Sequence, residues 1–219
     1  MNPFNYLHLQ MQLEGKEIFN ECRIRQVEVV PDEELPLMLI AQLVSQESLV
    51  YFGETILHDL QKKLNATSID FPNVDPLLDI LKLHNIPFEI GHYKTYMFPL
   101  QPIKDADVKC LSKHDSKVKA FGFDGFAEQV YAIECNESII SACVSTRENE
   151  KCGEAWVYTT PECRKRGFAQ KVVNAWARDL IGAGKVPFYS HRIENMASAS
   201  LARKLDLQAV FEEICITQI

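Results

Sequence analysis

The sequence lacks the basic excess that would point to a polyanionic partner. It carries 30 acidic against 23 basic residues, a formal net charge of -7. Nucleic-acid binding needs cationic side chains that displace counterions from phosphates, and anionic membrane surfaces attract basic segments in the same way. We therefore expect neither a nucleic acid nor a membrane as a partner.

Export signals, membrane spans and metal motifs are also missing. The start, Met1-Asn2-Pro3, has no basic region followed by an apolar run, and the apolar stretch from Leu35 to Val44 is too short to span a bilayer. None of the seven cysteines forms a C-x-x-C pair, and no histidine lies beside them at zinc-ligand spacing. An odd number of unpaired thiols fits a reducing compartment. We expect a cytoplasmic protein without a metal site.

What is present is the composition of a globular chain. The 219 residues are 47% hydrophobic and 24% charged, which allows one large domain or two small ones. The segment from Pro99 to Asp107 holds two prolines and three charged residues and is the best boundary. We expect an N-terminal α/β region over residues 1–104 and a second domain over residues 105–219.

The N-terminal region shows regular structure but no chemical motif. Residues Arg23 to Val30 are typical of a strand, and Phe88 to Phe98 of an extended segment. Glu54 to Leu64 has apolar residues at helical spacing, and Asp75 to His84 begins with an Asp-Pro helix start. The region could shape an acceptor pocket or act as a helper domain, and the sequence leaves both open.

The second half predicts a layered α+β domain. Two β-rich runs, Val130 to Glu134 and Ile139 to Thr146, form a predicted hairpin, and a third run covers Glu154 to Thr159. An amphipathic helix is predicted from Phe168 to the glycines at 182 and 184. The remaining elements are a strand at 186–190, a helix at 195–205 and a strand at 210–216.

The most informative segment runs from Thr159 to Ala169. A strand leads into a short loop with three cations, and the loop opens a helix at Gly167. The N-terminus of a helix presents unpaired N–H groups and the positive end of its dipole, and glycine allows a ligand to approach the backbone closely. These features together predict a site for pyrophosphate.

Arg164-x-x-Gly167-x-Ala169 resembles the acetyl-CoA signature of the GNAT superfamily of N-acetyltransferases. The resemblance extends over about Val130 to Ile216, because the order of strands and helices also matches and Asn195 opens the second helix as in the last motif of the family. It implies the GNAT acyl-CoA N-acyltransferase fold, with a mixed central sheet flanked by helices, in a branch of unassigned substrate.

The resemblance assigns roles to particular positions. The backbone of one strand would pair with the pantetheine arm of acetyl-CoA, at a gap opened by a bulge in that strand. The N–H groups of the basic loop would hold the pyrophosphate, and the second helix would add two contacts. The predicted cofactor-binding residues are Val157, Tyr158, Thr159, Arg164, Lys165, Arg166, Gly167, Phe168, Ala169, Asn195 and Ser198.

The resemblance also implies an acyltransferase that passes the acetyl group of acetyl-CoA directly to an amine. The acceptor amine must lose a proton before it attacks, and Glu154 is the predicted base. Glu154 could also be an ordinary carboxylate at a strand end, and His191 could be a surface histidine. The sequence does not decide whether the acceptor is a small molecule or a protein, or whether the protein forms a homodimer.

Two positions depart from the family pattern. Ala202 stands where many members carry a tyrosine that protonates the departing thiolate, and Asp206 stands where a glycine is usual, so the turn there is expected to differ. Because this tyrosine is missing, the protein could alternatively be a catalytically silent CoA-binding sensor or an interaction module.

Overall fold

The computed structural model describes residues 2–30, 34–99 and 107–219. The chain divides into two compact units. The first comprises Met1–Lys94 and Val210–Ile219, and the second Thr95–Ala209. The boundary predicted between residues 104 and 105 lies outside the described residues. No helix in the described parts of the chain is long and apolar enough to cross a membrane.

The described residues of the first unit form strands and three helices. In chain order its elements are α1 (Pro3–Leu13), β1 (Lys16–Asn20), β2 (Arg23–Gln26), β3 (Met38–Leu43), β4 (Ser48–Gly53), α2 (His58–Asn65), α3 (Asp75–Leu83) and most of β5 (Phe88–Met97) and β11 (Gln208–Gln218). A core of apolar residues, among them Ile40, Phe52, Leu77 and Ile214, joins α2 and α3 to the strands.

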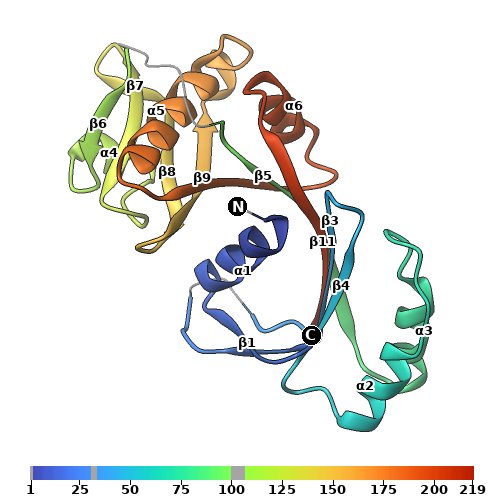
Figure 1. The fold of residues 1–219 in the computed structure, drawn as a ribbon. Coiled ribbons are helices and arrows are strands. Elements are labelled where there is room, and N and C mark those ends of the chain that lie inside the picture. Colours follow the sequence, from blue (N-terminus) through green and yellow to red (C-terminus); the bar gives the residue numbers. More distant parts are fainter. Residues whose placement is uncertain (1, 31–33, 100–106) are drawn as a thin grey trace. The chain divides into compact units, whose positions relative to one another are not determined.

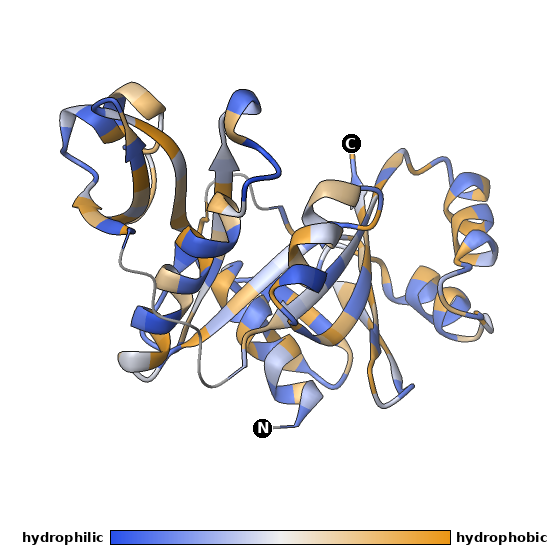
Figure 2. Ribbon diagram, turned by 90° about the horizontal axis from the view of Figure 1, so that it is seen from above, coloured by the Kyte–Doolittle hydropathy of each residue, from blue (hydrophilic) through white to orange (hydrophobic). Residues whose placement is uncertain are grey.

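The second unit holds the segments singled out in the sequence. Its elements are β6 (Lys109–Ser112), α4 (Ser116–Phe121), β7 (Gln129–Cys135), β8 (Ser138–Glu148), β9 (Cys152–Thr159), the 3-10 turn η1 (Pro161–Cys163), α5 (Phe168–Gly182), β10 (Val186–Arg192) and α6 (Met196–Lys204). Helices and strands alternate hydrophobic and hydrophilic segments along their length, as amphipathic elements around a core do (Figure 2).

The described strands form a mixed sheet in the order β1-β2-β4-β3-β11-β5-β10-β9-β8-β7-β6. Strands β6 to β9 are antiparallel to their neighbours, whereas β9 and β10 run parallel. Helix α5 packs across β7, β8 and β9 (Figure 1). The structure therefore has the mixed α+β fold that the sequence predicts.

The predicted apolar stripe of α5 is buried. Val172, Val173 and Trp176 are fully inaccessible, and the indole N–H of Trp176 donates to Ser145 Oγ at 2.9 Å. The helix ends near Gly184, which has a positive φ of 78°, as predicted from the glycines there. This packing fixes the direction of α5 and therefore the position of its N-terminus.

The predicted hairpin is confirmed and is tighter than expected. Asn136 and Glu137 both have positive φ, at 49° and 63°, which is the geometry of a type I′ turn. In the first unit the strand predicted for Arg23 to Val30 ends at Gln26, and the helix predicted from Glu54 begins at His58. Helices α1 and α4 and strands β1, β3, β4 and β6 were not predicted.

Candidate functional site

The two parallel strands β9 and β10 separate after a short paired segment. Their register covers three pairs, from Val186 opposite Cys152 to Phe188 opposite Glu154. Beyond these pairs β9 continues along β8 as far as Thr159, while β10 continues to Arg192. On the side of β10, the backbone of β9 after Glu154 therefore has no paired strand among the described residues.

The irregularity beside this gap lies in β8. The register between β8 and β9 shifts between Ser145 and Arg147, opposite Ala155 and Glu154. The prediction of a bulge in the strand that carries Val157 was therefore wrong. The extra residue belongs to the neighbouring strand, at the point where Arg147 turns to contact Glu154.

A pocket of about 690 Å³ lies in the second unit at this gap. Its walls come from the end of β9, the basic loop and start of α5, Tyr189 of β10, and α6. The lining residues are Val157, Tyr158, Thr159, Cys163, Arg164, Lys165, Gly167, Phe168, Ala169, Gln170, Tyr189, Asn195, Met196, Ala197, Ser198, Ser200, Leu201 and Lys204.

The loop before α5 is held in a left-handed conformation. Lys165 and Gly167 have φ of 62° and 85°, and Gly167 occupies the cap position of α5 without any side-chain cap. A Cβ at Gly167 would find its nearest neighbour, Gln170 Oε1, at 3.8 Å, so the space above it is open. Arg164 braces the loop, because its Nε donates to the carbonyl oxygen of Thr159 at 3.1 Å. Open N–H groups and two flanking cations suit a pyrophosphate.

The opposite wall begins at the N-terminus of α6. Asn195 Oδ1 accepts a hydrogen bond from the Ser198 N–H at 3.1 Å and so caps the helix. The Tyr189 hydroxyl bonds to the Ser198 side chain, and burial raises the pKa of Tyr189 to about 12. At neutral pH Tyr189 therefore carries its proton at the edge of the pocket.

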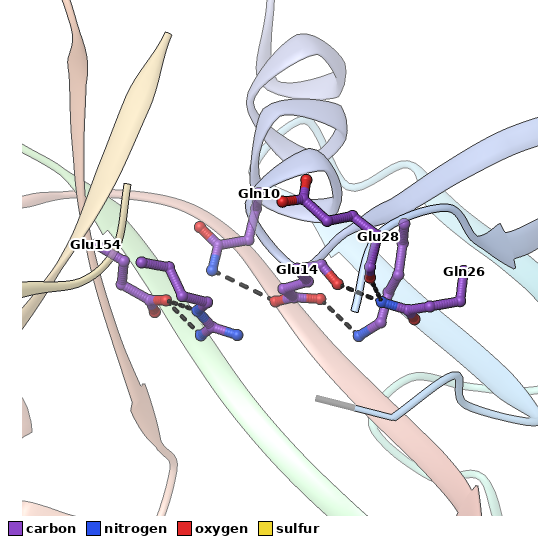
Figure 3. Close-up of polar contacts among 7 residues, drawn as sticks. Gln10, Glu14, Gln26, Glu28 and Glu154 are labelled. Atoms are coloured by element: carbon purple, nitrogen blue, oxygen red, sulfur yellow. Dashed lines mark hydrogen bonds and ion pairs between the residues drawn. The ribbon is translucent and has the colours of Figure 1, made fainter. Parts of the chain in front are cut away.

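Glu154 is placed on β9 but outside the residues that line the pocket. It is buried, at 4% exposure, and Arg147 Nε donates to its carboxylate at 3.0 Å while Nη2 makes a second contact (Figure 3). By strand alternation Glu154 shares a face of β9 with Trp156 and Tyr158. The guanidinium of Arg147 fixes the orientation of this carboxylate.

His191 is buried, contrary to the expectation of a surface histidine. Its exposed fraction is 6%, and its ring stacks on Tyr96 at a centroid distance of 5.5 Å. Its Nδ1 lies 2.8 Å from the carbonyl oxygen of Arg192, which can only accept, so Nδ1 carries a proton. Among the described residues its Nε2 has no hydrogen-bond partner.

The two departures from the family pattern have different outcomes. Ala202 is buried in the apolar core, and its methyl side chain has no proton that it could donate to the thiolate. Asp206 has a φ of 52°, the left-handed conformation that glycine favours and aspartate tolerates. The expectation of an altered turn was therefore wrong, because the Leu207 N–H still closes the helix end by donating to the Ala202 carbonyl at 3.1 Å.

The pocket contains every predicted cofactor-binding residue except Arg166. The guanidinium of Arg166 lies over the Phe168 ring, 5.1 Å from its centroid. Among the lining residues that the sequence did not single out are Met196, Ser200 and Lys204. Their spacing of four along α6 is the signal that could have identified them. The described parts of the chain contain no cluster of His, Cys, Asp or Glu that could hold a metal ion.

Comparison with known proteins agrees with this geometry. Residues 108–213 match the family model described as GNAT acetyltransferase. No curated protein matches the chain.

Two of the solved structures that match the chain illustrate the shared fold. One is a GNAT-family protein from Novosphingobium aromaticivorans, with 16% identity, a TM-score of 0.51, and coverage of 60% of this chain and 66% of that one. The other is a GNAT-family acetyltransferase from Colwellia psychrerythraea, with 12% identity, a TM-score of 0.51, and coverage of 78% of this chain and 76% of that one. Over residues 108–213, the chain is therefore similar to the GNAT acetyltransferase family.

Proposed function

We propose that the protein is an N-acetyltransferase that passes the acetyl group of acetyl-CoA directly to an amine. The observation that carries this proposal is the pocket at the gap between β9 and β10, which brings an open strand backbone and the N-terminus of α5 together. The GNAT family is an acyltransferase family, and membership implies the use of acyl-CoA.

The residues at the pocket fit acetyl-CoA by their chemistry. The backbone of Val157 to Thr159 offers hydrogen bonds to an amide-bearing arm, as a strand does to an added strand. The N–H groups between Arg164 and Ala169 would hold the pyrophosphate, and Asn195 and Ser198 would contact the cofactor from α6. Bound acetyl-CoA supplies an activated thioester, and the protein supplies alignment and proton transfer.

Two side chains are suited to the proton transfers. Glu154 takes the proton of the acceptor amine, directly or through water, from its face of β9, and Arg147 keeps its carboxylate oriented. Tyr189 replaces the tyrosine that is missing at position 202, because its hydroxyl is protonated at neutral pH and borders the pocket. The proton of Tyr189 would pass to the departing thiolate.

Calorimetry and a turnover assay test the proposed function. Acetyl-CoA and CoA should bind the wild type, and thiol release in the presence of amines should exceed the rate without them. Binding without amine-dependent thiol release would favour the alternative of a silent CoA-binding sensor. Absence of acetyl-CoA binding would contradict both.

Paired variants test the proton transfers. Tyr189→Phe should lower kcat by about tenfold to a hundredfold while acetyl-CoA binds as before, because only the proton donor is lost. Glu154→Gln should lower kcat by at least about a hundredfold while acetyl-CoA binds as before, because the amide cannot take the proton of the amine. An unchanged kcat in Glu154→Gln would return the glutamate to a structural role beside Arg147.

A further inference from the structure

An exposed aromatic row continues from the pocket along one face of β9. Trp156 and Tyr158 alternate on the same face and are 48% and 41% exposed. The ring of Phe126 stacks on Trp156 at 5.5 Å and 28°, and Phe121 lies 5.7 Å from Tyr158. Phe123 links the two phenylalanines at 5.1 Å and 5.7 Å, so the five rings form one continuous group.

The exposure of these rings is unusual for their place in the fold. β9 is an inner strand, with β8 and β10 as its neighbours. Side chains of an inner strand are normally covered, and tryptophan and tyrosine exposed together at a pocket mark sites that bind a ligand. The phenylalanines of the aromatic row come from outside β9: Phe121 is the last residue of α4, and Phe126 lies in the loop that follows α4.

Tyr158 connects the row to the pocket. It lines the pocket, and the guanidinium of Arg164 lies over its ring, 5.7 Å from the centroid. Helices α5 and α6, which supply the proposed cofactor contacts, share an apolar core with Val157, a residue that points to the other face of β9. A second substrate on the Trp156 face would therefore meet the acetyl group from the opposite face of the strand.

We propose that the aromatic row binds the acceptor, and that the acceptor is an amine bearing an aromatic ring. This inference rests on the proposed function. Stacking on Trp156 and Phe126 suits a ring, and the faces of the aromatic rings attract the ammonium form in which an amine arrives. Glu154, two residues before Trp156 on the same face, then stands on the side from which the amine approaches.

The test compares two probes that differ in the ring, 2-phenylethylamine and n-propylamine, titrated calorimetrically into CoA-saturated protein. The wild type should bind 2-phenylethylamine at least about tenfold more tightly. Trp156→Ala should reduce this ratio to near one, and Trp156→Phe, which keeps a ring, should preserve most of it. Phe19→Ala removes another exposed ring, in the first unit, and should leave the ratio unchanged.

The result that would overturn the inference is equal binding of the two amines by the wild type, or a preference that survives Trp156→Ala. Titration of acetyl-CoA into each variant separates this outcome from failure of the proposed function. If the wild type does not bind acetyl-CoA, the proposed function is contradicted. If it binds acetyl-CoA but shows no preference between the amines, only the role proposed for the aromatic row is contradicted.

Discussion

The two helices that border the pocket begin in different ways. Helix α5 starts at Gly167, in the left-handed conformation and without a side-chain cap, whereas α6 starts at Asn195, whose side chain accepts from the Ser198 N–H. An uncapped helix start in a pocket leaves N–H groups that a ligand can satisfy, and a capped start is already partly satisfied. Under the proposed function, the start of α5 binds the ligand, whereas the side-chain cap of α6 stabilises the helix first.

The largest effect is expected when a negative charge enters the uncapped start. Gly167→Glu should weaken acetyl-CoA binding at least about a hundredfold, because a carboxylate there repels phosphate and fills the open space above residue 167. Gly184→Glu is the matched control: φ is 78° against 85°, a Cβ there meets nothing within 4 Å, and the residue is outside the pocket. Calorimetry measures binding and thermal unfolding measures stability.

Both glutamate variants should lose similar stability, about 1–2 kcal/mol, because a residue with a Cβ is strained in the left-handed region. Loss of binding in both variants would indicate that general destabilisation and not the charge at α5 is responsible. Retained binding in Gly167→Glu would show that the pyrophosphate lies elsewhere.

A smaller effect is expected at the capped start. Asn195→Ala should lower the free energy of unfolding by about 1 kcal/mol through loss of the cap, and should weaken acetyl-CoA binding a few-fold. Asn195→Asp keeps an acceptor for the Ser198 N–H and should therefore remain stable, yet its charge should weaken binding more than alanine does. If Asn195→Asp binds as tightly as the wild type, Asn195 is a cap alone.

The smallest effects are expected at Lys165, where stability and binding should change in opposite directions. Lys165 has a φ of 62°, so Lys165→Gly relieves strain and should raise the melting temperature slightly. The same change removes a cation from the loop, and binding should weaken a few-fold and depend less on salt. A titration series at increasing ionic strength measures both changes in binding. A salt dependence equal to that of the wild type would exclude Lys165 from the phosphate contact.

Local chemistry explains which parts of the fold could be predicted. The stripe of Val172 and Trp176 and the glycine near the end of α5 follow rules that act within one element, and these predictions are confirmed. The helix α1 was missed because its apolar pattern is weak, with buried Gln10 among the apolar residues, although Asn2 caps the helix directly before Pro3. The polar core in which Gln10 and Lys16 contact Glu14 depends on chain folding that no short window contains (Figure 3).

The site residues within one loop or at one helix start could be predicted from the sequence. Those that depend on how strands pair with one another could not. The basic loop and Asn195 both line the pocket, and each could be predicted because its residue types are typical of the start of a helix. The ion pair between Arg147 and Glu154 depends on the register between β8 and β9. The role proposed for Tyr189 depends on its burial and on its position at a pocket built by several elements. Such pairings are set by tertiary packing.

The early separation of β9 and β10 leaves a strand edge in the interior of the sheet. Such an edge is a template for other strands, and a molecule that hydrogen-bonds to it removes that hazard while stabilising the folded state. At a hundred times its dissociation constant a ligand adds about 2.7 kcal/mol. Under the proposed function, the lifetime of the protein in a cell should then increase with the supply of acyl-CoA.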